Sequence, residues 1–390
     1  MKLIKADIFI VETEKPHLGG GPWFFLKLET DDGIVGWGET AILAALANLN
    51  AGYEKMMLDI FDNYLKGQDP LNRESLMTTL YARLSCQHAD YFIGGFISAF
   101  DIALWDIAGK YYNAPIYQLL GGKFRDKIRA YTYICHPVNG QAGLSHEPSY
   151  VAELARRLVE EDGFTAMKFD PIPMINRTGN PLPPWQLSLS ELEKAEYTVR
   201  QIREAVGKKA DILIGTHGQT TPSGALRLAK ALEPYDPLWF EEPVPPENVD
   251  EMAKVSSGTT IPIATGERLN SAHDFLRLFK AGATAIAQPD AGSCGGITQL
   301  KKISALAEPF YVQMAPHVWG GPIITAAAIQ IDTVIPNFLI QESIHISRGF
   351  FDKLLLEPFN FENGYLYASD KPGIGIELVD KQLMQYAINK

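Results

Sequence analysis

The chain has 390 residues, of which 46% are hydrophobic and 21% are charged, and its formal net charge at pH 7 is −11. These values are typical of a soluble globular enzyme, and an acidic balance without a long basic run argues against a nucleic-acid partner. No apolar stretch approaches the roughly 18 residues that span a bilayer, so we expect no membrane partner.

The cysteines and the first residues indicate a compartment. Cys86, Cys135 and Cys294 include no CxxC pair and are expected to be reduced. The opening sequence MKLIKADIFIVETE becomes acidic too early for a signal peptide. We therefore expect a cytoplasmic protein.

Residues 1–125 have the pattern of an α+β domain. The segments KLIKADIFIVE and WFFLKLETDDGIVGWGET predict strands, with DDG as a hairpin turn. The segment FISAFDIALWDIAGKYY predicts a helix, because its apolar residues recur at helical spacing. The glycines of APIYQLLGG end this region.

Residues 126–345 alternate short apolar runs with helix-like segments. We count eight candidate strands, from KIRAYTYIC to PNFLIQES. This rhythm predicts a parallel β/α barrel, and the chain length suits a barrel of about 250 residues plus a smaller domain. We expect the tail, residues 346–390, to fold back on the first domain.

Charged side chains lie near the ends of the predicted barrel strands. They are Lys168, His217, Glu241, Glu267, Asp290, His317 and Glu342. In parallel barrels the chemistry sits at the C-terminal ends of the strands. Carboxylates, two histidines and a lysine at one mouth predict a divalent-metal site with acid/base partners.

Several motifs, in order, resemble the mandelate racemase subgroup of the enolase superfamily. They are SAFDIALWDIAGKYYNAPIYQLLGG, EEP at Glu241, GER at Glu267, QPD at Asp290 with a following GGIT, and APH at His317. The chain is most similar to sugar-acid dehydratases of the galactonate type, on THGQ followed by ALEPYDPLWFEEPVPPEN. The resemblance implies a (β/α)7β-type modified TIM barrel with an N-terminal α+β capping domain. It also implies a homo-oligomer, either a dimer or an octamer.

The resemblance implies Mg²⁺ as cofactor, with Mn²⁺ as the alternative. Glu241 and Glu267 match two of the family's three carboxylate ligands, but the first ligand position holds Gly215. Asp211 is too far along the same strand to replace it. Water, Asp170 or His217 could complete the site, and we favour water because magnesium readily keeps water ligands.

The resemblance also implies roles for the remaining strand-end residues. His317 and Asp290 match the acid/base dyad, and Lys168 is expected to contact the substrate carboxylate or to assist the enediolate. His217 is placed to protonate a departing hydroxyl, because β-elimination needs an acid at the leaving group. We expect Glu342, Tyr133 and Trp319 to contact the substrate. By strand alternation, Glu242 and Arg268 face away and are expected to be structural.

The resemblance, together with His217, implies a Mg²⁺-dependent dehydratase of an aldonate or aldarate. The α-proton would be removed through a metal-stabilised enediolate, and loss of the 3-hydroxyl would give a 2-keto-3-deoxy acid. The first alternative is a racemase or epimerase of an α-substituted acid, which Lys168-Phe169-Asp170 disfavours because the family's second lysine is missing. The second alternative is a catalytically inactive descendant that lost its metal with the Gly215 ligand.

Overall fold

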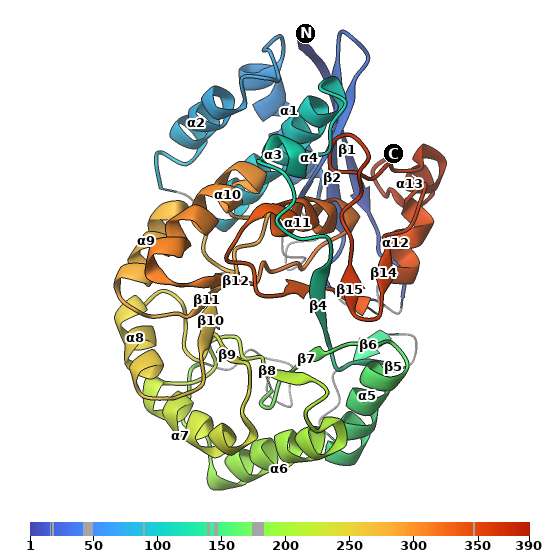
Figure 1. Ribbon diagram of the computed structural model, residues 1–390. Helices are drawn as coiled ribbons and strands as arrows, with labels where there is room; N and C mark the ends of the chain where they lie inside the picture. Colours follow the sequence, from blue (N-terminus) through green and yellow to red (C-terminus); the bar gives the residue numbers. More distant parts are fainter. Residues whose placement is uncertain are drawn as a thin grey trace.

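The computed structural model describes residues 1–15, 17, 19–41, 50–88, 90–138, 141–143, 147–173, 183–345 and 348–390. We call residues 1–125 the capping domain. It contains an antiparallel sheet in the order β1-β2-β3, followed by helices (Figure 1). These elements are β1 (Leu3–Val11), β2 (Trp23–Thr30), β3 (Val35–Thr40), α1 (Asn50–Ile60), η2 (Phe61–Leu65), α2 (Arg73–Leu84), α3 (Tyr91–Tyr111) and α4 (Ile116–Leu119).

Helix α3 packs directly on β3 because two glycines of the strand have no side chain. A Cβ built on Gly38 would lie 1.9 Å from the carbonyl oxygen of Ala99, and one on Gly36 would lie 2.3 Å from that of Ala103. These distances are far below van der Waals contact, so a larger residue would force the helix away from the sheet.

Helix α3 also corrects the expectation that no apolar stretch approaches the length of a membrane span. The helix has 21 residues, and an 18-residue window of it has a mean hydropathy of 1.4. By length and composition alone it could cross a membrane. However, 83% of that window is buried inside the protein, which is typical of a core helix. Strand β3 and the barrel helix α10 both pack against α3, and most residues of the helix are therefore buried.

Residues 126–345 contain the predicted barrel. Neighbouring strands pair in parallel in the order β4, β7, β8, β9, β10, β11 and β12, and β13 pairs with β4. A parallel bridge from Met314 to Phe338 joins β12 to the segment before β13 and closes the ring. The strands are β4 (Ile128–Tyr133), β7 (Ala166–Phe169), β8 (Asp211–Ile214), β9 (Trp239–Glu241), β10 (Ile263–Thr265), β11 (Ile286–Ala287), β12 (Gln313–Met314) and β13 (Gln341–Glu342).

A helix follows each of the barrel strands β4 and β7 to β12, which confirms the (β/α)7β pattern. The helices are α5 (Pro148–Glu160), α6 (Leu189–Val206), α7 (Pro222–Leu232), α8 (Val249–Ser257), α9 (Ala272–Lys280), α10 (Gly296–Ala307) and α11 (Pro322–Val334). Local sequence sets several of their starts. Ser188 and Glu191 form a capping box before α6, and Thr221 caps α7 ahead of a proline in its first turn. A small hairpin, β5 (His136–Val138) and β6 (Gln141–Gly143), precedes α5.

The C-terminal tail returns to both parts of the molecule. It contains α12 (Arg348–Leu354), β14 (Phe361–Glu362), β15 (Tyr365–Leu366) and α13 (Asp380–Tyr386). Strand β15 pairs antiparallel with β4. Asn389 accepts a hydrogen bond from the backbone N–H of Ile10 at 2.9 Å and donates one to the carbonyl of Ile8 at 2.9 Å. The tail therefore extends the capping-domain sheet edge at β1 (Figure 1).

Buried polar groups of the capping domain bind the N-termini of barrel helices. Glu39 accepts backbone N–H bonds from Gly321, Ile323 and Ile324 at the start of α11. On α3, Asp101 accepts from the backbone N–H of Thr298 at 2.9 Å, near the start of α10. These side chains satisfy orphan donors of the helix ends and so fix the capping domain on the barrel.

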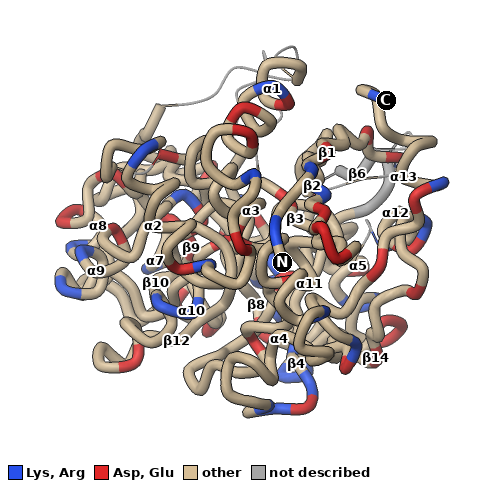
Figure 2. Tube along the Cα trace, turned by 90° about the horizontal axis from the view of Figure 1, so that it is seen from above, with Lys and Arg blue, Asp and Glu red and all other residues tan. Residues whose placement is uncertain are grey.

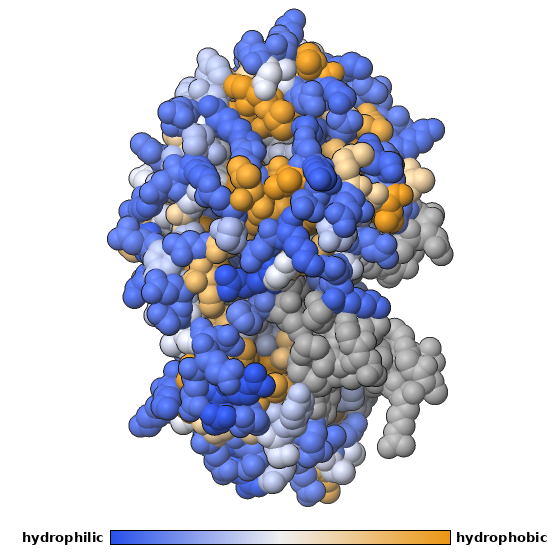
Figure 3. Space-filling model, turned by 90° about the vertical axis from the view of Figure 1, so that its right-hand side faces the viewer, coloured by the Kyte–Doolittle hydropathy of each residue, from blue (hydrophilic) through white to orange (hydrophobic). Residues whose placement is uncertain are grey.

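The outer surface carries charges of both signs. Figure 2 shows acidic and basic residues interspersed around the barrel helices and the capping domain. Figure 3 shows a face that is mostly hydrophilic, with hydrophobic residues in separate groups, several of them in the capping-domain half.

Candidate active site

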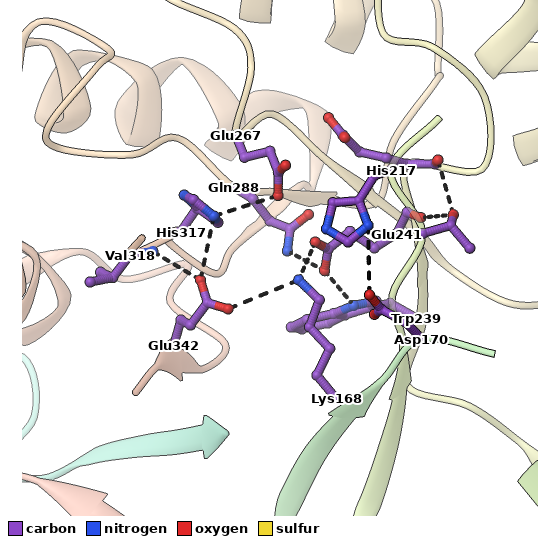
Figure 4. A network of polar contacts seen from close by, with 12 residues as sticks. Lys168, Asp170, His217, Trp239, Glu241, Glu267, Gln288, His317, Val318 and Glu342 are labelled. Atoms are coloured by element: carbon purple, nitrogen blue, oxygen red, sulfur yellow. Dashed lines mark hydrogen bonds and ion pairs between the residues drawn. The ribbon is translucent and has the colours of Figure 1, made fainter. Parts of the chain in front are cut away.

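The predicted site residues meet at the C-terminal mouth of the barrel. Figure 4 shows side chains from several strand ends pointing toward one another. Lys168 lies in β7 and Asp170 follows it, while Gly215 and His217 follow β8. Glu241 ends β9, Glu267 follows β10, Asp290 follows β11, His317 follows β12 and Glu342 ends β13. Parallel strands bring these ends to one side, so residues far apart in sequence share one pocket.

Lys168 is the central cation of this pocket. Its side chain is 1% exposed, and its ammonium group forms an ion pair with Oε1 of Glu241 and lies 3.9 Å from Oε1 of Glu342. It also lies 4.8 Å from the ring centroid of Tyr133. Burial alone would lower the pKa of Lys168, but the surrounding carboxylates hold it well above its usual range. The lysine therefore stays charged.

Glu241 is fully buried and has partners on both oxygens. Besides the ion pair with Lys168, its Oε2 accepts hydrogen bonds from the Trp239 indole at 3.1 Å and the Gln288 amide at 2.9 Å. Burial raises the pKa of Glu241, and the ammonium of Lys168 opposes that shift. The sequence reasoning missed Gln288 and Trp239. The sequence could have shown them. Trp239 lies two residues before Glu241 and Gln288 lies two residues before Asp290, and side chains two residues apart in a strand point to the same side.

His317 and Asp290 lie together as a dyad. Nδ1 of His317 donates to Oδ2 of Asp290 at 2.7 Å, and Oδ1 of Asp290 accepts from the backbone N–H of Gly292 at 2.6 Å. The other ring nitrogen of His317 lies 3.6 Å from Glu267 and 3.8 Å from Glu342. Burial would lower the pKa of His317, but Glu267, Glu342 and Asp290 raise it to about 10.

Glu267 is flanked by both histidines of the pocket. Figure 4 shows His317 and His217 on opposite sides of this carboxylate. Burial would raise the pKa of Glu267, but His317, His217 and Lys168 lower it to about 2. Glu267 is therefore an anion throughout the neutral range, as a cation ligand must be.

His217 and Asp170 form a looser pair on the other side of the pocket. Nδ1 of His217 lies 3.7 Å from Oδ2 of Asp170. Neither this nitrogen nor Oδ1 of Asp170 has a hydrogen-bond partner among the described residues. Burial lowers the pKa of His217, and burial raises the pKa of Asp170 to about 7.

The space beside Gly215 is occupied by Asp170. A Cβ built on Gly215 would lie 2.1 Å from Oδ1 of Asp170. The sequence left water, Asp170 and His217 as candidates for this position and favoured water. The carboxylate of Asp170 lies beside this position, because Asp170 points to the same side of β7 as Lys168. The choice among the three candidates as cation ligand stays a prediction.

The remaining predicted contacts line the same mouth. Tyr133 is 4% exposed and meets Trp319 edge to face, with ring centroids 6.1 Å apart. Oε2 of Glu342 accepts the backbone N–H of Val318 at 2.9 Å, which fixes Glu342 between Lys168 and His317. Glu242 turns away from the pocket and forms an ion pair with Arg268, with Nε 2.8 Å from its carboxylate.

Known proteins match this chain over nearly its full length. Residues 18–121 match the family model of the mandelate racemase/muconate lactonizing enzyme N-terminal domain, and residues 150–382 match that described as enolase C-terminal domain-like. The chain belongs to the mandelate racemase/muconate lactonizing enzyme family. This finding confirms the resemblance to the enolase superfamily. The closer likeness to galactonate-type dehydratases stays a prediction.

Three solved structures of the family illustrate the similarity. Two are named as proposed mandelate racemase/muconate lactonizing enzymes. The one from Burkholderia SAR-1 is 43% identical, with a TM-score of 0.92 over 99% of this chain and 94% of that one. The one from Labrenzia alexandrii DFL-11 is 42% identical, with a TM-score of 0.91 over 99% and 100%. A proposed dehydratase protein from Salmonella enterica serovar Typhimurium is 33% identical, with a TM-score of 0.89 over 99% and 98%.

Members of the superfamily typically use Mg²⁺, and the chemistry of this pocket fits that ion. Asp170, Glu241 and Glu267 offer only oxygen donors, which Mg²⁺ prefers. Oδ1 of Asp170 is buried and has no hydrogen-bond partner among the described residues, so it can accept a cation. Among the described residues no three acidic, histidine or cysteine side chains are yet gathered closely enough to enclose a metal. In this arrangement the ammonium of Lys168 supplies the positive charge at Glu241.

Proposed function

We propose that the protein is a Mg²⁺-dependent dehydratase of a sugar acid, either an aldonate or an aldarate, that forms a 2-keto-3-deoxy acid. The observation that carries this proposal is the pair of histidines on opposite sides of Glu267 (Figure 4). Dehydration needs two proton transfers, one from C2 and one to the departing 3-hydroxyl, and each histidine can perform one of them. The relative named as a proposed dehydratase supports the same reaction class.

Glu241 and Glu267 would hold the cation. When bound, the ion would supply electrostatic stabilisation for the negative charge that develops on the substrate carboxylate. Lys168 would also stabilise this negative charge, because its charged ammonium can turn from Glu241 to the substrate carboxylate.

His317 is the proposed base at C2. Asp290 binds Nδ1 and so fixes the ring with Nε2 facing the pocket. The pKa of about 10 reflects the negative charges of Glu267, Glu342 and Asp290 around the ring. Positive charge at these carboxylates would lower that pKa and free Nε2 to take the C2 proton.

His217 is the proposed acid at C3. As the C3–O bond breaks, a protonated His217 would give its proton to the departing hydroxyl, which leaves as water. The two electrons of the C2–H bond form the C2–C3 double bond, and the resulting enol becomes the 2-keto acid. Tyr133 and Trp319 would form a wall of the substrate pocket, and Glu342 would hydrogen-bond the substrate beside Lys168.

A product screen tests this proposal. Aldonic and aldaric acids are incubated with the enzyme and Mg²⁺, and 2-keto acid formation is measured with semicarbazide. We expect one group of stereoisomers to react and EDTA to stop the reaction. Inversion at C2 without 2-keto acid would indicate the racemase or epimerase alternative. No reaction and no Mg²⁺ binding would indicate the inactive descendant.

The two histidines can be separated by solvent exchange. In D₂O, His217→Asn should still exchange the C2 hydrogen of the substrate, followed by NMR, but should not form 2-keto acid. His317→Asn should lose both exchange and product. If His217→Asn forms product at the wild-type rate, a different group protonates the leaving hydroxyl.

A further inference from the structure

We propose that Asp170 supplies the third carboxylate of the cation site, in the space that Gly215 leaves open. The inference rests on the proposed function, because it concerns the same cation. Where the family resemblance places a carboxylate after β8, this chain has glycine. The geometry points to a carboxylate that has moved one strand over, from the end of β8 to the end of β7.

The glycine is explained by space and not by backbone conformation. Gly215 is not among the described glycines with positive φ, so any residue could adopt its backbone angles. A Cβ at this position would lie 2.1 Å from Oδ1 of Asp170 and 2.9 Å from Cε of Lys168. Even alanine would therefore displace Asp170, and the glycine and the aspartate belong together.

Backbone hydrogen bonds place Gly215 between the two strands that carry the other charges. Its N–H donates to the carbonyl of Phe169 at 2.9 Å, and the next N–H, of Thr216, donates to the carbonyl of Glu241 at 3.2 Å. A carboxylate lying over Gly215 consequently stands beside the strand that presents Glu241. This is where a side chain from β8 would have presented its own oxygens.

Asp170 itself is poised to bind a ligand. The residue is 3% exposed, and Oδ1 has no hydrogen-bond partner among the described residues. Oδ2 lies 3.7 Å from Nδ1 of His217. A buried carboxylate oxygen without a partner is costly, and a cation shared with Glu241 and Glu267 would remove that cost.

Calorimetric titration with Mn²⁺ of protein freed of divalent cations tests the inference. Asp170→Asn keeps the shape of the side chain and removes its charge, and should weaken binding by at least about tenfold. Gly215→Ala should also weaken binding, although it adds only a methyl group, because the methyl displaces Asp170. The matched control is Asp211→Asn at the opposite end of β8, where the carboxylate pairs with Arg129 at 2.7 Å. It should stay within about twofold of wild type.

A second test exchanges the residues at positions 170 and 215, and it decides the question even if a single variant folds poorly. Circular dichroism checks the folding of each variant. Gly215→Asp alone should not tighten Mn²⁺ binding, because two carboxylates would compete for one space. The double variant Asp170→Gly with Gly215→Asp should recover affinity relative to either single variant. Tighter binding by Gly215→Asp alone, or unchanged binding by Asp170→Asn, overturns the role of Asp170 and leaves the proposed function standing. A wild-type protein that binds no Mn²⁺ overturns both.

Discussion

At the scale of single residues, the charge on His317 governs what the pocket can do. Its ring contacts Asp290 on one side and lies within 4 Å of Glu267 and Glu342 on the other. Asp290 orients the ring, and all three carboxylates favour the proton on it. A cation at Glu267 would thus act on the base through the charge balance of the pocket, without touching the imidazole.

Replacing His317 by Asn should abolish turnover. Asn can keep a hydrogen bond to Asp290 but cannot take the C2 proton, so kcat/KM should fall by about 10²–10⁴-fold. Asp290→Asn should be milder, because it loses the orientation of the ring and not the base. Initial rates of 2-keto acid formation measure both, with circular dichroism as the control for folding. A His317→Asn rate within about tenfold of wild type would show that another base operates.

The same histidine should make the stability of the cation-free protein depend on pH. Its pKa is about 10 in the folded protein, against 6.5 for an ordinary histidine. Below pH 6.5 both folded and unfolded states hold the proton, so the stabilisation is fully present. As pH rises toward 10 the unfolded state loses its proton first, and the stabilisation is lost. Urea unfolding in EDTA should therefore show stability falling across this range.

The matched control for that experiment is His317→Asn, which removes the titrating ring. Its stability should fall less steeply between pH 6.5 and 10 than that of wild type. Parallel curves for the two proteins would contradict the raised pKa of His317.

The sequence predicted which residues reach the pocket but not how they pair. The ends of the strands can be predicted from the sequence, because the apolar runs stop at a charged residue, as at Lys168 and Glu241. The ion pair between those two was not predicted, since alternation gives the side a residue faces and not its partner. Asp170 was one of several candidates beside Gly215. Only the spacing of neighbouring strands shows that its carboxylate fills the gap.

At the scale of elements, contacts between backbones set the position of α3. The sequence predicted this helix from its apolar spacing and β3 from its hairpin. It did not show that Gly36 and Gly38 bring the two within contact of their backbones. The number and order of the short barrel strands were likewise predictable. Strands of a parallel sheet are buried on both faces, so each appears in the sequence as an apolar run.

Adding one methyl group to β3 should measure this packing. Gly38→Ala would place Cβ 1.9 Å from the carbonyl of Ala99, so α3 must shift, at a cost of about 1–3 kcal/mol. The control is Gly52→Ala in α1, where a Cβ meets nothing within 4 Å. That change should be neutral or stabilise by about 0.5–1 kcal/mol, because alanine is the better helix former. Denaturant unfolding compares the two, and equal stabilities would refute the close packing.

At the scale of the whole molecule, the barrel mouth is held by parts of the chain that carry no chemistry. The capping domain binds the start of α11 through Glu39, and α11 lies between the strands that present His317 and Glu342. Burial raises the pKa of Glu39 to about 8, although three backbone N–H groups oppose the shift. The sequence predicted a capping domain over a barrel, but this contact joins residues almost 300 positions apart and follows only from the assembled fold.

Because the proposed cation ligands come from different strands, cation binding should stabilise the whole barrel. Only the folded chain brings Asp170, Glu241 and Glu267 together, so Mg²⁺ should raise the free energy of unfolding by about 2.7 kcal/mol at a hundred times its Kd.

Glu241→Gln should remove this increase. The variant will also be less stable without Mg²⁺, because the buried ammonium of Lys168 loses its closer ion-pair partner and keeps only Glu342 at 3.9 Å among the ion pairs of the described residues. The quantity to compare is therefore the increase on adding Mg²⁺, measured by thermal unfolding of each protein with and without the ion. Asp211→Asn, at the far end of β8, should keep the full increase. If Glu241→Gln is stabilised by Mg²⁺ as strongly as wild type, the ion binds elsewhere, and the carboxylates of this pocket serve only to hold Lys168 and His317.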